Sequence, residues 1–199
     1  MLDIQRIRRS RSRSSDALRE MFRRCQRSAM KKFVSKLPYA AIFAFGIILD
    51  FIVKHIVRTN MRQGESIPLI DGVFHITYTE NTGAAFSMLS GKTVLLSVVT
   101  VVVVALLLYL LFADKIRGKL ACILVALIAS GGTGNLIDRI FRGSVTDMFD
   151  FRLINFAIFN VADIFVTCGA ILFIIIFFVS KGEVLQWNSS REKKMKDKD

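Results

Sequence analysis

Two carboxylates, Asp147 and Asp163, stand out in this chain because of the apolar sequence around them. Both belong to residues 131–165, a stretch that concentrates polar side chains between long apolar runs. A carboxylate beside hydrocarbon is costly, so acidic residues in such places are rare and are usually functional. The stretch therefore predicts a site, whose other polar residues are Asn135, Asp138, Arg139, Asp150 and Asn160.

The chemistry open to two facing carboxylates is acid–base catalysis. Two Asp side chains in a poorly hydrated site cannot both ionise readily, so one of them keeps a proton. The ionised Asp can then take a proton from water while the protonated Asp donates to a scissile carbonyl, which hydrolyses a peptide bond. The chain has 2 His and 3 Cys, no CxxC pair and no serine in a nucleophile motif. We therefore expect an aspartic endopeptidase that uses no metal and no cofactor.

Several of the polar residues also have a purely structural explanation. Asn160 suits the N-cap of a helix, and Asp163 suits the third position after it, where the positive helix end favours an acid. Asn135, Asp138 and Arg139 can share one helical face and cap the end of a helix. For all five residues we keep both interpretations, the structural role and a role in the predicted site.

A further ionisable pair, Asp50 and Lys54, lies four residues apart near the end of the first long apolar run. The spacing predicts an ion pair on one helical face, with the lysine near the membrane interface. A paired lysine can also brace the site, so the two interpretations are compatible.

The composition places these residues in a membrane protein. Of the 199 residues 53% are hydrophobic, and the mean hydropathy is +0.47, which is unusual for a soluble domain of this length. Four apolar runs are long enough to cross a bilayer as helices, namely residues 38–57, 93–112, 120–137 and 156–179. We predict an all-α membrane protein, a four-transmembrane-helix bundle with a small β-sheet in the first outer loop.

The two longer connections flank the predicted site. In residues 58–92, apolar and polar side chains alternate over residues 73–79, which predicts a strand of a small sheet on the membrane surface, with His75 exposed. The following Asn81-Thr82-Gly83 is by itself only a turn, in which glycine permits close backbone approach. Residues 140–155 are predicted to form the second outer loop.

The distribution of Lys and Arg predicts the orientation. Residues 1–37, 113–119 and 181–199 hold 12, 3 and 6 of the 28 Lys and Arg residues. Cytoplasmic segments of membrane proteins are enriched in these residues, so we expect both termini inside and both long loops outside. We divide the chain into a basic cytoplasmic arm (1–37), a four-span membrane peptidase domain (38–180) and a polar cytoplasmic tail (181–199).

The basic arm has two alternative interpretations. Its segment RRSRSRSS resembles a nucleic-acid-binding tract. A basic arm before a membrane helix more simply holds that end in the cytoplasm and contacts anionic lipid. The arm does not resemble a cleavable signal peptide, because the next apolar run is too long and lacks an evident cleavage site. Met30-Lys31-Lys32 is an alternative start, so we expect residues 1–29 to be dispensable for activity.

Five short motifs occur in a fixed order over residues 38–179. They are Asp50 with Lys54, NTGAAF (81–86), GNLIDR (134–139), GSVTD (143–147) and FNVAD (159–163). Each motif is weak alone, but in this order on four spans the chain resembles lipoprotein signal peptidase (signal peptidase II). The resemblance implies a peptidase of the bacterial inner membrane that removes the signal peptide from diacylglyceryl-modified prolipoproteins, cutting before the lipidated Cys.

The resemblance also implies roles for individual residues. It makes Asp147 and Asp163 the catalytic dyad. It makes the remaining motif residues a substrate-binding and supporting set, namely Asp50, Lys54, Asn81, Gly83, Asn135, Asp138, Arg139 and Asn160. The family usually has Val-Val-Asp-Phe where this chain has Val145-Thr146-Asp147-Met148, and Asp150 is a rival for the first carboxylate, although the GSVTD context favours Asp147.

The partners that the resemblance implies are prolipoproteins and membrane lipids, without nucleic acid, and we expect a monomer. A competing class is a proton-coupled transporter or channel. Four spans are few for that class, no inverted repeat is visible, and the polar residues gather toward one face of the membrane. A third class, a membrane-anchored nucleic-acid binder, rests on the arginine-rich arm alone.

Overall fold

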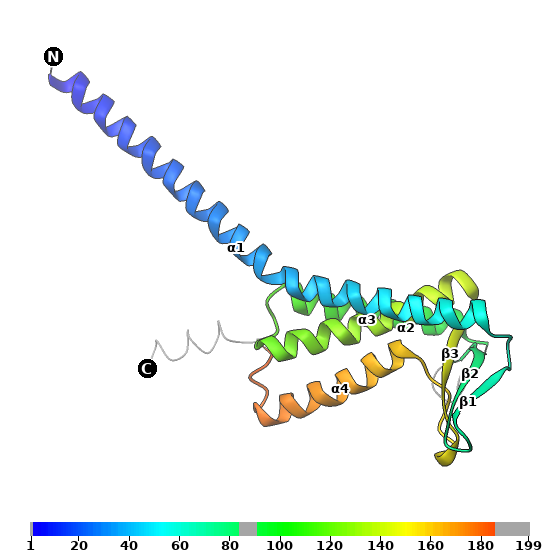
Figure 1. Ribbon diagram of the computed structural model, residues 1–199. Helices are drawn as coiled ribbons and strands as arrows, with labels where there is room; N and C mark the ends of the chain where they lie inside the picture. Colours follow the sequence, from blue (N-terminus) through cyan, green and yellow to red (C-terminus); the bar gives the residue numbers. More distant parts are fainter. Residues whose placement is uncertain (1, 84–90, 186–199) are drawn as a thin grey trace. The chain divides into compact units, whose positions relative to one another are not determined.

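The computed structural model describes residues 2–83 and 91–185 (Figure 1). It forms two compact units, Met1–Pro38 and Tyr39–Asp199. The first unit belongs to helix α1 (Leu2–Asn60), so the basic arm is helical from Leu2 onward. The predictions for residues 84–86 of the NTGAAF motif and for the tail beyond residue 185 lie outside the described residues.

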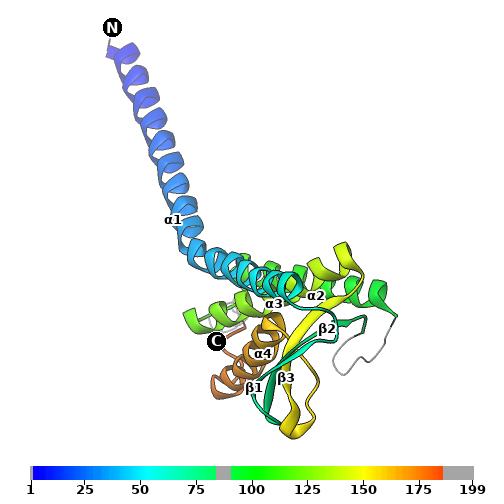
Figure 2. The same cartoon turned by 45° about the vertical axis from the view of Figure 1, so that its right-hand side comes forward.

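The second unit is built on four helices. They are the remainder of α1, α2 (Thr93–Phe112), α3 (Lys119–Arg142) and α4 (Val161–Val179). Each is long and apolar enough, by length and composition, to cross a membrane. Helix α2 coincides with the predicted span 93–112, and the predicted span 120–137 lies inside α3. The helices run alongside one another, and α3 packs against both α2 and α4 (Figures 1 and 2).

Helix α3 occupies the centre because its small residues allow close packing. Ala121, Ala126 and Ala129 are buried in it. A Cβ atom at Gly131 would collide with the carbonyl oxygen of Ala162, so only glycine lets α3 and α4 approach this closely. Large apolar side chains instead cover the outward faces of the bundle, an arrangement suited to lipid; examples are Val94, Val98, Val102, Ile174 and Phe178.

A three-stranded antiparallel sheet stands at the end of the bundle where α1 and α3 finish (Figures 1 and 2). Its strands are β1 (Ser66–Ile70), β2 (Phe74–Asn81) and β3 (Val145–Phe151), in that order. The predicted strand 73–79 is β2, but the sheet is not confined to the first loop, because β3 comes from the second. Residues Val145 to Met148 of β3 are all buried. The sequence therefore lacks the alternation of apolar and polar residues that marks a half-buried strand.

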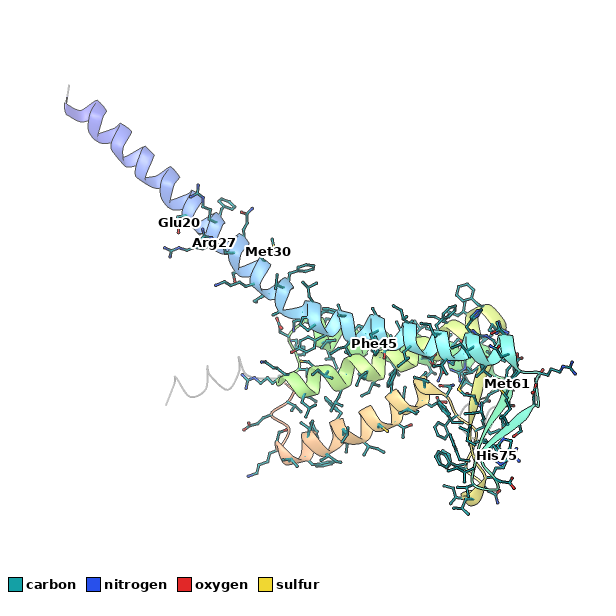
Figure 3. The ribbon with its side chains drawn as sticks, viewed as in Figure 1. Glu20, Arg27, Met30, Phe45, Met61 and His75 are labelled. Atoms are coloured by element: carbon teal, nitrogen blue, oxygen red, sulfur yellow. The ribbon has the colours of Figure 1, made fainter. Side chains whose placement is uncertain are left out.

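The expectation that His75 is exposed is wrong. The residue is only 6% exposed. Figure 3 labels it at the strands. It lies opposite Asp150 of β3, and its Nδ1 is 3.1 Å from the hydroxyl of Ser66. The histidine is therefore a buried polar residue of the central strand β2, with neighbours on both β1 and β3.

Helix α4 begins at Val161, five residues later than the predicted start at Phe156. Phe159 pairs instead with Phe149 of β3, and each backbone N–H donates to the other residue's carbonyl. The apolar run is continuous in sequence, so its composition does not reveal that its first five residues lie outside the helix. This short segment carries Asn160 and the start of α4 to the sheet.

Candidate active site

Asp147 and Asp163 line one cavity of about 300 Å³. Asp147 comes from β3 and Asp163 from the first turn of α4. Four further polar residues line the same cavity, namely Asn81, Asn135, Arg139 and Thr167. The rest of its wall is largely apolar and includes Phe156, Ile158, Phe159 and Ile164. The fold therefore brings two carboxylates and four hydrogen-bonding side chains to a space with apolar walls.

Asp147 is almost fully buried, with 2% of its surface exposed. It lies opposite Thr79 of β2, which places it diagonally beside Asn81, and Asn81 Nδ2 donates to its Oδ2 at 3.1 Å. Burial, together with the negative charge of Asp163, raises the pKa of Asp147 to about 7. This carboxyl group can therefore keep its proton at neutral pH, as an acid catalyst requires.

Asn160 joins the two carboxylates. Its side-chain Oδ1 accepts from the backbone N–H of Asp163 at 2.9 Å, and the backbone N–H of Asn160 donates to Asp163 Oδ2 at 3.2 Å. This is the capping box of α4, so the structural prediction for Asn160 and Asp163 is confirmed. Capping leaves the amide Nδ2 available, and it donates to Asp147 Oδ1 at 2.6 Å. The capping residue therefore also fixes the position of Asp163 relative to Asp147.

Asn135 holds the other side of Asp163. Its Nδ2 donates to Asp163 Oδ1 at 2.8 Å. Its Oδ1 accepts from Lys54 Nζ at 2.8 Å and from Asn160 Nδ2 at 3.1 Å. The ammonium group has only donors, so it selects the orientation in which the amide nitrogen of Asn135 faces Asp163.

Asp50 and Lys54 form the predicted ion pair at 2.7 Å. Both side chains are only 1% exposed. Asp50 Oδ1 accepts from the backbone N–H of Ala162 at 2.9 Å, which satisfies a donor in the first turn of α4. A Cβ atom at Gly134 would lie 2.5 Å from Asp50 Oδ2, so glycine makes room for the pair.

Asp138 connects α3 to β3 and lies outside the cavity wall. Its Oδ2 accepts from the backbone N–H of Thr146 at 3.1 Å, next to Asp147 in sequence. Its Oδ1 accepts from Arg58 at 3.1 Å, and Arg58 also donates to the Thr146 hydroxyl. Sequence reasoning missed Arg58 and Thr146. The spacing Asp50, Lys54, Arg58 could have revealed the arginine, because residues four apart share a helical face.

Arg139 and the turn that begins at Asn81 contact each other beside the cavity. The guanidinium donates to the carbonyl of Gly83 at 3.0 Å, and the N–H of Gly83 donates to Asn81 Oδ1 at 2.8 Å. Within the described part of the chain, Nε of Arg139 is buried and has no hydrogen-bond partner. A buried N–H group without a hydrogen-bond partner is suited to donate to a carbonyl oxygen of a bound molecule.

Asp150, the rival carboxylate, lies elsewhere. It lies three positions after Asp147 along β3, so the two side chains point to opposite faces of the sheet. Asp150 Oδ2 accepts from Thr77 at 2.7 Å and from Arg152 at 2.9 Å. Burial opposes its ionisation, but these hydrogen bonds and the charge of Arg152 outweigh that effect and hold the pKa of Asp150 below its ordinary value. Asp147 is therefore the carboxylate that shares the cavity with Asp163.

The described residues contain no group of three or more His, Cys, Asp or Glu side chains arranged to hold a metal ion. Of the residues predicted for the site, the structure brings Asn81, Asn135, Arg139, Asp147 and Asp163 to the cavity. Asp50, Lys54, Asp138 and Asn160 lie behind its wall in one connected hydrogen-bond network.

Comparison with known proteins identifies the family. Residues 42–179 match the family model described as signal peptidase (SPase) II. The lipoprotein signal peptidase of Fusobacterium nucleatum is 40% identical over 149 residues, which cover 73% of this chain and 90% of that protein. The lipoprotein signal peptidase of Halothermothrix orenii is 46% identical over 130 residues, covering 65% of this chain and 87% of that protein.

Solved structures agree with this assignment. A bacterial membrane enzyme solved at 2.3 Å resolution superposes with a TM-score of 0.68 and 31% identity, covering 77% of this chain and 94% of that one. A second, solved at 1.9 Å, has a TM-score of 0.64 and 34% identity, covering 70% and 92%. The family match spans the four apolar helices, the sheet and the cavity. This multi-pass membrane protein therefore belongs to the signal peptidase II family, the aspartic peptidases known as lipoprotein signal peptidases.

Proposed function

We propose that this chain removes the signal peptide from diacylglyceryl-modified prolipoproteins by cutting before the lipidated Cys, with Asp147 and Asp163 as the catalytic dyad. The observation that carries the proposal is that one residue, Asn160, hydrogen-bonds both carboxylates at the wall of one cavity. Relatives named lipoprotein signal peptidase support the substrate class.

The two carboxylates take different roles in the proposed reaction. The raised pKa of Asp147 makes it the partner that carries the shared proton at neutral pH. Asp163 accepts a proton from water as the water oxygen attacks the scissile carbonyl, and Asp147 donates its proton to the carbonyl oxygen. When the tetrahedral intermediate collapses, Asp163 passes its proton to the leaving amide nitrogen and Asp147 recovers its own. The dyad thus returns to its starting state.

The polar residues around the dyad position the substrate and the carboxylates. Arg139 offers its buried Nε to a carbonyl oxygen of the substrate backbone. Asn81 and Asn160 orient Asp147, and Asn135 orients Asp163. A substrate that approaches along the apolar wall of the cavity is thereby presented to the dyad with its scissile bond fixed.

The proposed placement in the membrane has four transmembrane helices, cytoplasmic termini and the sheet outside. The 21 of 28 Lys and Arg residues in the two terminal segments and the 113–119 turn support it. The dyad lies where β3 meets the first turn of α4, at the sheet end of the bundle. The dyad would therefore act at the outer surface of the membrane, where a lipid-anchored substrate is held. The chain is proposed to act as a monomer.

The test is to reconstitute the purified protein in lipid and to add a prolipoprotein with or without the diacylglyceryl group. We expect release of the signal peptide from the lipid-modified form and an amino-terminal lipidated Cys on the product. Equal cleavage of the unmodified form would contradict the proposed substrate class. No cleavage of either form by correctly inserted protein would contradict the activity itself.

A further inference from the structure

A second cavity, of about 240 Å³, lies beside the cavity that Asp147 and Asp163 line. Four residues border both cavities, namely Asn81, Asp147, Ala157 and Ile158. The two spaces therefore adjoin at Asp147, the carboxylate that strand β3 supplies. The proposed reaction uses only the first cavity, which leaves the second without a role.

The second cavity differs from the first in polarity. Its remaining wall consists of Thr79, Glu80 and Asn155, all of which are polar. The wall of the first cavity is instead largely apolar beyond the dyad, with Phe159 and Ile164 among its residues. An extended chain that crosses Asp147 from the first cavity to the second would therefore pass from apolar to polar surroundings.

The sheet places Thr79 in this wall. Thr79 is the cross-strand partner of Asp147, so the two side chains project from the same face of the sheet. Glu80 projects from the other face, where its carboxylate accepts from the hydroxyl groups of Tyr78 and Ser144 at 2.9 and 3.1 Å. The side chain that β2 adds to the cavity beside Asn81 is therefore that of Thr79, whose hydroxyl can donate and accept.

An unusual backbone conformation places Asn155. Its φ of 48° lies in the left-handed region, which asparagine adopts more readily than most residues with a side chain. The N–H of Asn155 donates to the carbonyl of Arg152 at 3.1 Å, and the N–H of Phe156 donates to the carbonyl of Phe151 at 3.2 Å. These bonds fix the turn, so Asn155 is held at the wall of the second cavity with an amide that can donate and accept.

The change in polarity at Asp147 corresponds to a change in the proposed substrate. A signal peptide is apolar in its central region, whereas the mature chain after the lipidated Cys continues into water. The lipid chains of that Cys remain in the hydrocarbon. The second residue of the mature chain is therefore the first residue after the scissile bond whose side chain can enter a polar cavity.

We propose that the second cavity is a subsite for the second residue of the mature lipoprotein, where Thr79 and Asn155 select a side chain that forms hydrogen bonds. The inference rests on the proposed function. Asn and Leu have similar shapes, but only Asn can donate and accept hydrogen bonds. A neutral hydrogen bond changes an equilibrium constant about fivefold, so the subsite should favour Asn over Leu by at least about that factor.

The test compares two lipid-modified prolipoproteins that carry Asn or Leu directly after the lipidated Cys. The full-length protein is reconstituted in lipid, and kcat/KM is measured for each substrate. Thr79→Val with Asn155→Gly should bring the ratio of the two values to about one, because valine keeps the shape of threonine without its hydroxyl and glycine tolerates the left-handed backbone. The matched control, Thr167→Val in the wall of the first cavity, should leave the ratio unchanged.

Equal kcat/KM values for the two substrates with the unmodified protein would overturn the subsite. So would a double variant that slows both substrates by the same factor, which indicates a cavity that holds only water. Equilibrium binding of two fluorescent lipopeptides, diacylglyceryl-Cys followed by Asn or Leu, repeats the comparison without cleavage. Equal affinity, or no binding, would refute the subsite even if both prolipoproteins are cleaved. A preference for the Asn lipopeptide that the double variant removes, without cleavage of either prolipoprotein, would support the subsite and refute the proposed activity.

Discussion

The ammonium group of Lys54 lies 2.8 Å from Oδ1 of Asn135, and both side chains are buried. An amide side chain has a nitrogen that donates hydrogen bonds and an oxygen that accepts them. An ammonium group has only donors, so it can pair only with the amide oxygen. The contact therefore turns the amide nitrogen of Asn135 toward Asp163. A lysine from α1 thus controls a hydrogen bond to a proposed catalytic carboxylate on α4.

We predict that Lys54→Met lowers kcat at least about tenfold, because Asn135 loses the partner that orients it. The variant should also lose about 3–5 kcal/mol of stability, since Asp50 is left as an unpaired buried charge. The control is Lys54→Met with Asp50→Asn, which removes that charge and keeps an acceptor for the N–H of Ala162. Thermal unfolding should recover in the double variant while kcat stays low. Recovery of both would mean that the lysine has only a folding role.

Asp147→Asn and Asp163→Asn should each reduce signal-peptide release to background with little change in insertion. Asn keeps the shape of the side chain and one of its two acceptor oxygens but cannot exchange a proton. Cleavage of a lipid-modified prolipoprotein, followed by gel mobility, measures the effect. Near wild-type release by both variants would rule out the aspartic mechanism for this chain.

Asp150→Asn is the matched control on the same strand. Its side chain points to the other face of β3, and its ion pair with Arg152 is partly exposed, so the cost should stay within about 1 kcal/mol. Cleavage should remain close to that of the unmodified chain. An inactive Asp150→Asn beside an active Asp147→Asn would assign the first carboxylate to Asp150.

The rate of cleavage should fall as the pH rises above about 7, because the proton-bearing form of Asp147 is lost there.

The raised pKa of Asp147 also affects the stability of the protein. Between the ordinary value near 3.8 and about 7, the folded state binds more protons than the unfolded state, so this group's contribution to stability falls as pH rises. Asp163→Asn removes a negative charge and should lower the pKa of Asp147. Infrared difference spectra of the protonated carboxyl band across a pH titration would measure that shift, and an unchanged midpoint would contradict the coupling.

A reporter enzyme that is active only in the cytoplasm should be active when fused after Lys181 and inactive when inserted at the β1–β2 turn near Asp71. The expectation rests on the distribution of Lys and Arg, which holds positively charged segments inside. Inactivity after Lys181 together with activity at Asp71 would reverse the proposed orientation.

The sequence alone was sufficient for features that depend on local pattern. The uncharged run 93–112 predicted α2 to the residue, because a span must be apolar over the whole hydrocarbon thickness. The spacing of Asn160 and Asp163 predicted their capping box, and that of Asp50 and Lys54 predicted their ion pair, since helical periodicity fixes which neighbours meet. Five ordered motifs were enough to suggest the family.

Contacts between distant segments were decided only by the tertiary structure. Strand β3 exists because β2 and the 156–160 segment pair with it, and no local alternation marks it. The same pairing delays the start of α4, buries His75 and turns Asp150 away from the cavity that Asp147 enters. The link from Lys54 through Asn135 to Asp163 joins three helices. Residues on one helix meet at fixed spacing, whereas residues on different helices and strands meet only once packing has set the position of each element.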